Sequence, residues 1–196
     1  MFGVEDEFTI VFVGRIMPEK GLHHLILASK ILKQKGYKFK LLIAGPLGHF
    51  DMEGLGGYPR FCFELINKLE LVDNTRYVGR SEREELRNLY CASDLVVVPS
   101  LWEDPCPTVV LEAMASGRPV VAYASGGIPE LIPPYGGVVA EGRNPVLLAK
   151  AIEMTMQGTA SFNEASTIEW VKEKFSYQAI AQKLIKLFMA MVSSSS

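Results

Sequence analysis

The sequence predicts a doubly wound α/β fold: a parallel six-stranded sheet with helices on both faces and extra helices at the carboxyl end. Short, apolar, β-branched runs alternate along the chain with segments whose apolar residues recur at helical spacing. Runs of this kind are typical of strands that are buried on both faces. Strands joined through helices must run parallel, with right-handed crossovers. The predicted strands are residues 8–14, 39–44, 75–78, 94–99, 119–124 and 137–140.

The segments between and after these strands carry the helical pattern. Ser81 is the predicted N-cap of its helix, because acidic residues follow it in the first turn. A chain of 196 residues can bury most of its apolar surface in one domain. We expect that domain over residues 1–192, with a core over about 8–158, C-terminal helices over about 161–192 and a disordered tail over 193–196. The predicted helices are residues 21–35, 59–71, 82–92, 109–115, 129–132, 146–156, 162–174 and 177–192.

Composition argues against several classes of protein. The net charge is −2 and basic residues are scattered, so no nucleic-acid partner is expected. No segment reaches the ~18–20 apolar residues that span a bilayer, and residues 1–7 lack the basic-then-apolar pattern of a signal peptide. The three cysteines are irregularly spaced and the three histidines have no metal-binding spacing, which argues against disulfides and a metal site. We expect a cytoplasmic protein.

One edge of the predicted sheet carries unusual loops. In doubly wound sheets, ligands bind beyond the carboxyl ends of the strands. A single glycine in such a loop is more often an ordinary turn residue, but glycines or acids after all six strands predict a binding edge. These loops are Gly14-Arg15, Gly45-Pro46, Gly79-Arg80, Asp104-Pro105, Ser125-Gly126-Gly127 and Glu141-Gly142.

Two cations stand in the loop after the first predicted strand. Arg15 and Lys20 flank Pro18, which is expected to start the next helix. Both could face a phosphate at that helix N-terminus, where free N–H groups favour anions. The alternative is that Lys20 is solvated and Arg15 pairs with Glu19, and spacing alone leaves both open. The G-x-G-x-x-G and P-loop signatures are absent, which argues against those two kinds of phosphate site.

Two acids follow the fourth predicted strand. Glu112 lies in a helix that is apolar on nearly every face, so we expect its carboxylate to be buried and to need a partner. That partner is either structural, such as Arg118 or a backbone amide, or a ligand. Asp104 precedes Pro105, a pattern that fits an N-cap with proline at the first helical position as well as it fits a functional acid.

Four motifs follow one another in the order and spacing of a known family. Together, from about residue 8 to about residue 156, they resemble the C-terminal, donor-binding half of the group 1 retaining glycosyltransferases of GT-B architecture, the glycogen synthase-like and sucrose synthase-like enzymes. The resemblance implies a Rossmann-like nucleotide-sugar-binding domain. The motifs are Gly14-Arg-x-x-Pro-Glu-Lys-Gly21, Ala92-Ser-Asp-Leu95 with Pro99-Ser100, Glu112-Ala-Met-Ala-x-Gly-x-Pro-Val-Val121, and Gly126-Gly-x-x-Glu130.

The resemblance implies a role for each candidate residue. The family carries two acids with seven residues between them, a frame that fits Asp104 and Glu112. The first is usually glutamate, so Asp104 is a departure, and Glu103, one residue out of frame, is an alternative. Glu112 is expected to bond the donor ribose, and the first acid to lie near the donor sugar. The implied catalytic residues are Arg15, Lys20 and Asp104, and the implied donor-binding residues are Gly14, Val78, Gly79, Arg80, Glu103, Pro107, Thr108, Val109 and Glu112.

Within that set, each group has its own expected contact. Arg15 and Lys20 would hold the diphosphate and balance the charge of the leaving group, so no metal or cofactor is required. Backbone amides around residues 107–109 would contact the phosphate or sugar, and residues 78–80 would line the base pocket. The expected substrate is a nucleoside diphosphate sugar, with UDP favoured over GDP and ADP.

The expected function is donor binding for a retaining, metal-independent transfer of a hexose to an unknown acceptor. Two alternatives stay open: one half of a two-domain nucleotide-sugar epimerase, and a non-catalytic interaction domain with a relic donor pocket. In the family the acceptor binds an N-terminal Rossmann-like domain, which is absent here, so we expect little or no transfer by this chain alone. The apolar stripe of residues 177–192 either packs against that domain or covers the chain's own sheet. Membrane association of a longer protein stays open and has no signal here.

Overall fold

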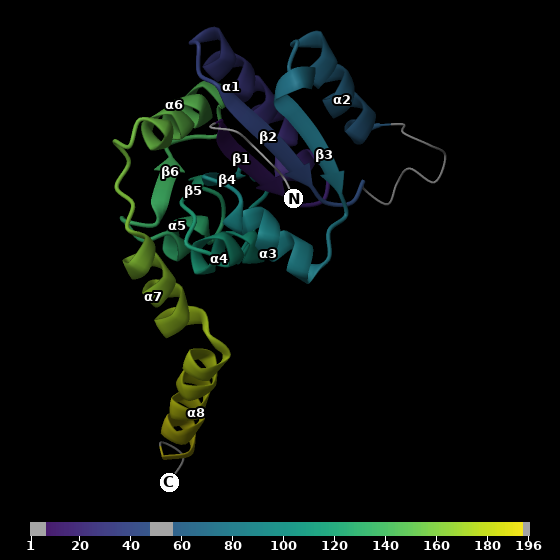
Figure 1. The fold of residues 1–196 in the computed structure, drawn as a ribbon. Helices are drawn as coiled ribbons and strands as arrows, with labels where there is room; N and C mark the ends of the chain where they lie inside the picture. Colours follow the sequence, from purple (N-terminus) through teal and green to yellow (C-terminus); the bar gives the residue numbers. More distant parts are fainter. Residues whose placement is uncertain (1–6, 48–56, 194–196) are drawn as a thin grey trace.

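The computed structural model describes residues 7–47 and 57–193 (Figure 1). The expectations for residues 1–6, His49 and the tail at 194–196 lie outside this range. The described residues form a six-stranded sheet in the order β3-β2-β1-β4-β5-β6, and every neighbouring pair is parallel. The predicted doubly wound sheet is therefore confirmed. Its strands are β1 (Phe8–Val13), β2 (Phe39–Ala44), β3 (Thr75–Gly79), β4 (Leu95–Val98), β5 (Val120–Tyr123) and β6 (Gly137–Ala140).

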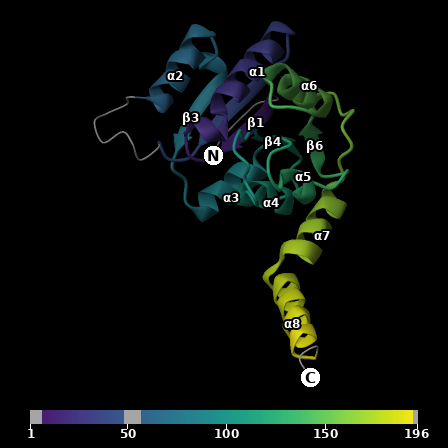
Figure 2. The same ribbon diagram turned by 180° about the vertical axis from the view of Figure 1, so that it is seen from behind.

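Helices cover both faces of the sheet. Figures 1 and 2 show α1, α2 and α6 on one face and α3, α4 and α5 on the other. Connections run outward from β1 on one side and then cross back to β4, so the strand order reverses between β1 and β4. The helices are α1 (Leu22–Gln34), α2 (Tyr58–Lys68), α3 (Arg83–Cys91), α4 (Thr108–Ala115), α5 (Ile128–Leu131), α6 (Pro145–Met156), α7 (Glu164–Phe175) and α8 (Tyr177–Ser193), with short 3-10 turns at Pro18–Lys20 and Val72–Asn74.

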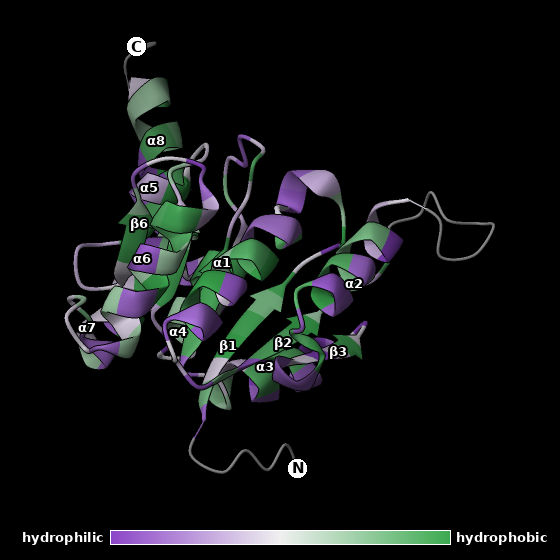
Figure 3. Ribbon diagram, turned by 90° about the horizontal axis from the view of Figure 1, so that it is seen from above, coloured by the Kyte–Doolittle hydropathy of each residue, from purple (hydrophilic) through white to green (hydrophobic). Residues whose placement is uncertain are grey.

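Alternate side chains of the central strand feed the cores on the two faces. Ile10 and Phe12 of β1 belong to the core under α1, α2 and α6, whereas Val11 packs on the opposite face beside Leu89 of α3. Figure 3 shows β1 and β2 mainly hydrophobic, while α1 and α2 carry alternating hydrophobic and hydrophilic bands. A strand between two helical layers is buried on both sides, which explains the continuous apolar runs in the sequence.

One expectation for the helices is wrong, and one of two alternatives for another helix is excluded. The N-cap of α3 is Glu82 rather than Ser81, because the Glu82 side chain accepts from the third-residue amide while the Glu85 carboxylate accepts from the Glu82 amide. The apolar stripe of α8 does not cover the sheet: the helix extends away from it beyond α7 (Figure 1), and none of its described side chains is buried.

Within residues 7–47 and 57–193, every helix is too short or too polar to cross a bilayer.

Candidate functional site

The loops after β1, β2 and β3 are joined at the carboxyl edge of the sheet. The Gly14 amide donates to the carbonyl of Ala44 at 3.0 Å, and the Gly45 amide donates to the carbonyl of Gly79 at 2.7 Å. A Cβ on Gly45 would lie 2.0 Å from the Gly14 carbonyl oxygen. Glycine at position 45 is therefore required for the two loops to pack backbone against backbone.

Gly21 docks the loop after β1 onto the loop after β4. It adopts a left-handed conformation (φ 69°), and a Cβ there would lie 1.9 Å from the Pro99 carbonyl oxygen. Two residues further along, the Leu101 amide donates to the Glu19 carbonyl at 2.8 Å. The two loops that carry the predicted cations and acids are thus held in a fixed relation.

Gly21→Ala is expected to lower the free energy of unfolding by about 3 kcal/mol or more, because its Cβ collides with backbone at a left-handed position. The matched control is Gly36→Ala, where φ is also positive (87°) but nothing lies within 4 Å of the added Cβ. The control should lose only about 1–2 kcal/mol from the backbone conformation. Urea unfolding of both variants measures the difference, and equal losses would contradict the close approach.

The structure brings Lys20 and Asp104 together. Lys20 Nζ lies 2.8 Å from Asp104 Oδ2, and the two side chains are 26% and 16% exposed. Lys20 is therefore not simply solvated, and Asp104 is not the N-cap of α4. That helix begins at Thr108 with Pro107 as its N-cap residue. The cause is local, since Pro107 disfavours the helical region for the residue before it and so delays the helix.

Arg15 projects from the same loop with an exposed side chain. Among residues 7–47 and 57–193 its guanidinium has no hydrogen-bond or ion-pair partner, and the alternative pairing with Glu19 is not formed. The guanidinium is available to an anionic ligand at this edge.

Glu103 anchors the acidic loop to its neighbours. Its carboxylate accepts from the Arg143 guanidinium and from the Gly126 amide, and Arg143 Nη1 donates to the Leu101 carbonyl at 3.0 Å. The Arg143 hydrogen bond and the Gly126 amide lower the pKa of the Glu103 carboxyl. The loops after β4, β5 and β6 are thereby linked. Sequence reasoning missed Arg143, because its partners lie 40 or more residues away.

Arg143→Met is expected to lower the free energy of unfolding more at pH 7 than at about pH 3. The pKa of Glu103 is depressed in the folded state, so its contribution is present above the unfolded value and is lost as pH falls through the folded value. The bond from Arg143 to the Leu101 carbonyl is lost at both pH values.

Urea unfolding at both pH values measures this. Arg87→Met, which removes an exposed arginine of α3 that has no described partner, is the control. A difference between the two variants that is as large at pH 3 as at pH 7 would contradict the assignment.

The glycine pair after β5 seats the acidic loop. The Gly127 amide donates to the Asp104 carbonyl at 2.9 Å. A Cβ on Gly126 would lie 2.3 Å from that same carbonyl oxygen, and one on Gly127 would lie 2.0 Å from the Pro105 carbonyl oxygen. The Gly126-Gly127 motif therefore fixes the main chain of Asp104.

Glu112 differs from its expected environment. Its side chain is exposed, because α4 turns Val110, Ala113 and Met114 into the core and Glu112 outward. Its Oε2 accepts from the hydroxyl of buried Tyr90 at 2.8 Å, so the structural partner is Tyr90 rather than Arg118. Burial and the negative charge of Glu112 raise the pKa of Tyr90. The other carboxylate oxygen has no hydrogen bond to the described residues, which leaves it open to a ligand.

The N-terminus of α4 lies directly after these acids in the chain. Pro107 is buried, Thr108 is exposed and Val109 is half-buried. No side chain caps the first amides, because the preceding residue is a proline. Uncapped amides at a helix N-terminus favour an anion.

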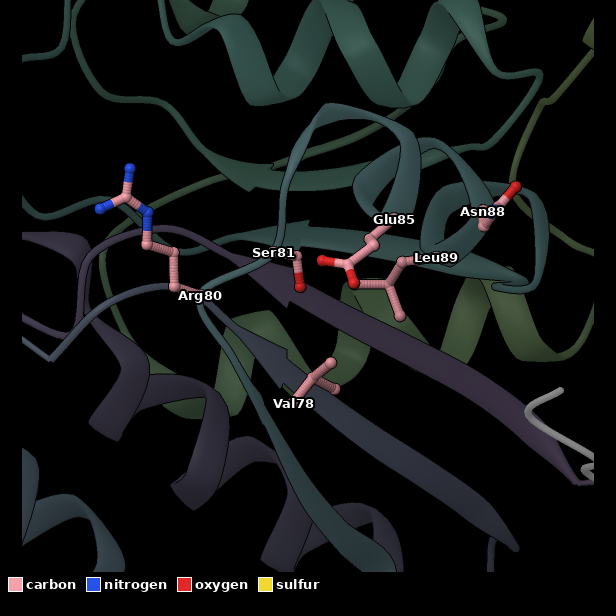
Figure 4. A pocket seen from close by; sticks show the side chains of 6 residues that line it. All are labelled: Val78, Arg80, Ser81, Glu85, Asn88 and Leu89. Atoms are coloured by element: carbon pink, nitrogen blue, oxygen red, sulfur yellow. The ribbon is translucent and has the colours of Figure 1, made fainter.

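A cavity of about 200 Å³ opens between the end of β3 and α3 (Figure 4). It contains two of the three residues predicted for the base pocket, Val78 and Arg80, and sequence reasoning missed the others. Figure 4 shows Ser81 and Glu85 presenting oxygens toward the middle of the group, while the Arg80 guanidinium extends away. The lining residues are Val78, Arg80, Ser81, Glu85, Asn88 and Leu89.

The family model of glycosyl transferases, group 1, matches residues 3–165 of the chain. The chain belongs to this family. An uncharacterised glycosyltransferase of Methanocaldococcus jannaschii is 33% identical over 94% of this chain and 45% of its own length. A D-inositol 3-phosphate glycosyltransferase of Salinispora arenicola is 32% identical over 79% of this chain and 35% of its own. The chain therefore spans less than half the length of these relatives.

Solved structures resemble this group 1 glycosyltransferase domain over nearly its whole length. Sucrose-phosphate synthase from Thermosynechococcus elongatus superposes with a TM-score of 0.82 at 29% identity, over 96% of this chain and 46% of that one. Anabaena HepE in complex with UDP gives a TM-score of 0.82 at 24% identity, over 94% and 49%, a likeness of fold. The group 1 domain therefore has the fold expected for one half of a GT-B enzyme.

Proposed function

We propose that this domain binds the nucleotide-sugar donor of a retaining, metal-independent glycosyltransferase that moves a hexose from a nucleoside diphosphate sugar. The observation that carries the proposal is the Lys20–Asp104 pair at the carboxyl edge, which links the cationic loop to the acidic one. The uncapped start of α4 follows in the same acidic loop. Cations and uncapped amides at a helix N-terminus are both groups that bind a diphosphate.

The chemistry needs little more than these groups. During transfer the bond between the sugar C1 and the β-phosphate oxygen breaks, and its electron pair stays on the phosphate. The acceptor hydroxyl oxygen forms the new bond to C1, and its proton is released to solvent. Arg15 and Lys20 balance the charge that develops there. Backbone amides at residues 107–109 contact the phosphate or sugar, and Asp104 lies near the donor sugar. Glu112 accepts hydrogen bonds from the ribose hydroxyls through the carboxylate oxygen that Tyr90 does not contact.

The base pocket and the nucleotide are proposed from the cavity and from a neighbour in fold. The cavity beside Val78 and Arg80 is proposed to hold the base, with Gly79 between them. UDP is the proposed carrier because HepE, a neighbour in fold, was crystallised with UDP and with UDP-glucose.

Calorimetric titration of the chain with UDP, GDP and ADP tests the proposal. UDP is expected to bind most tightly of the three. If none of them bound measurably, and Glu112→Ala made no difference, the domain would not be a donor-binding domain.

We further propose that a second Rossmann-like domain of the same protein binds the acceptor and contacts α8. The support is the share of the relatives that this chain spans, 45% and 35%, and the exposed apolar side chains of α8. Phe188 is 59% exposed and Leu187 is 56% exposed. The chain alone should bind UDP but transfer sugar poorly, whereas a protein carrying both domains should transfer it. Radiolabelled UDP-sugars with an acceptor panel measure the difference.

A further inference from the structure

The cation that the proposed function assigns to the donor diphosphate, Lys20, is already paired with Asp104. Asp104 Oδ2 is the only partner of Lys20 Nζ within residues 7–47 and 57–193. An ammonium group has three donors, so two remain for a ligand. A phosphate oxygen that uses one of them comes within a few ångströms of the Asp104 carboxylate, because both oxygens share one nitrogen.

The main chain is held in place on both sides of the pair. On the Lys20 side, the Leu101 amide holds the Glu19 carbonyl at 2.8 Å. On the Asp104 side, the Gly127 amide holds the Asp104 carbonyl at 2.9 Å, and Gly126 packs against the same main chain. The two side chains are largely shielded from water, so the charge of Asp104 is felt by any anion bound to Lys20.

We propose that Asp104 competes with the diphosphate for Lys20 and opposes binding of the nucleoside diphosphate product more than binding of the nucleotide sugar. This rests on the proposed function. When the bond between C1 and the phosphate oxygen breaks, the electron pair left on that oxygen adds a negative charge that the sugar ester lacked. Repulsion from Asp104 is therefore greatest in the product complex. After the product leaves, Asp104 and Lys20 again form their ion pair, so the shielded Lys20 ammonium is not left without a partner.

Glu103, the neighbouring acid, has different partners. Its carboxylate is held by Arg143 and by the Gly126 amide. Asp104 is thus the acid of this loop that meets Lys20. It acts on the ligand through that lysine and through its own charge.

Titration calorimetry of the chain with UDP, UDP-glucose and uridine tests the inference. Asp104→Asn should tighten UDP binding by roughly three- to tenfold. It should tighten UDP-glucose less, and leave uridine unchanged because uridine has no phosphate. Glu173→Gln removes the same charge from an exposed residue of α7, away from the carboxyl edge, that has no described partner. That control should leave UDP affinity within about twofold, since exposed charges are screened.

Three results would overturn the inference: unchanged UDP affinity in Asp104→Asn, weaker UDP affinity, or an equal gain for UDP and UDP-glucose. Asp104→Ser, with folding checked by circular dichroism, serves as a second variant if the first does not fold. Failure of the wild-type chain to bind any of UDP, GDP and ADP would remove the proposed function and this inference together. Wild-type binding without a gain in the variants would remove the inference alone.

Discussion

Lys20→Met is expected to weaken UDP binding by about thirtyfold or more. A charge-assisted hydrogen bond to a phosphate is worth roughly 1.5–3 kcal/mol. The substitution also strands the Asp104 carboxylate, whose side chain is only 16% exposed, next to the incoming diphosphate. An unpaired, shielded charge adds to the loss, so this should be among the most damaging single changes at the site.

The double variant Lys20→Met/Asp104→Asn separates the two causes. It should recover part of the lost UDP affinity, because the stranded acid is gone while the missing cation is not restored. Lys150→Met, at an exposed lysine of α6 without a described partner, is the charge control and should bind UDP like the wild type. UDP affinity that is unchanged in Lys20→Met would show that the lysine does not contact the diphosphate.

The fold could be predicted because its signals are local. An apolar run such as residues 39–44 is continuous in sequence for the same reason that it is buried between two helical layers. Local signals mislead where two of them compete. Asp104 followed by Pro105 left a helix cap open as an alternative, but Pro107 delays the helix, which begins at Thr108. The N-cap of α3 lies one residue after the predicted position because the Glu82 and Glu85 side chains form a capping box.

Most side-chain partners at the site could not be predicted, because they are distant in sequence. The Lys20–Asp104 bond spans 84 residues, and the Arg143–Glu103 bond spans 40. Spacing alone predicted which residues stand at the carboxyl edge but not which of them pair. The pairing bears on the proposed function. It connects Asp104, the departure from the family's usual glutamate, to a cation, which argues against interpreting that departure as a sign of a relic pocket.

The environment of Glu112 could not be predicted from neighbouring residues in the sequence. A count of apolar neighbours predicted a buried carboxylate, but a short helix buries only the side that faces the sheet. The residue that orients it, Tyr90, comes from α3 and lies 22 residues earlier. The Tyr90 hydroxyl donates to one carboxylate oxygen of Glu112 and thereby orients the other.

Glu112→Ala is therefore expected to weaken UDP binding by about ten- to hundredfold, since the ribose hydroxyls lose a charged acceptor. The matched ligand is 2′-deoxy-UDP, which lacks one of those hydroxyls. The wild-type chain should prefer UDP over 2′-deoxy-UDP, and Glu112→Ala should bind the two almost equally. Calorimetric titration with both ligands measures this preference. A preference that survives in Glu112→Ala would assign the ribose contact to another residue.

Tyr90→Phe is the companion variant for this experiment, because it removes only the hydroxyl that donates to Glu112. The carboxylate keeps its charge but loses its orientation, so UDP affinity should fall less than in Glu112→Ala, by about two- to fivefold. A loss as large as that in Glu112→Ala would mean that Glu112 acts mainly by holding α3 against α4. We expect a small loss of UDP affinity in Tyr90→Phe, and we expect only Glu112→Ala to lose the preference for UDP over 2′-deoxy-UDP. These two results together would assign the Glu112 carboxylate to the ribose.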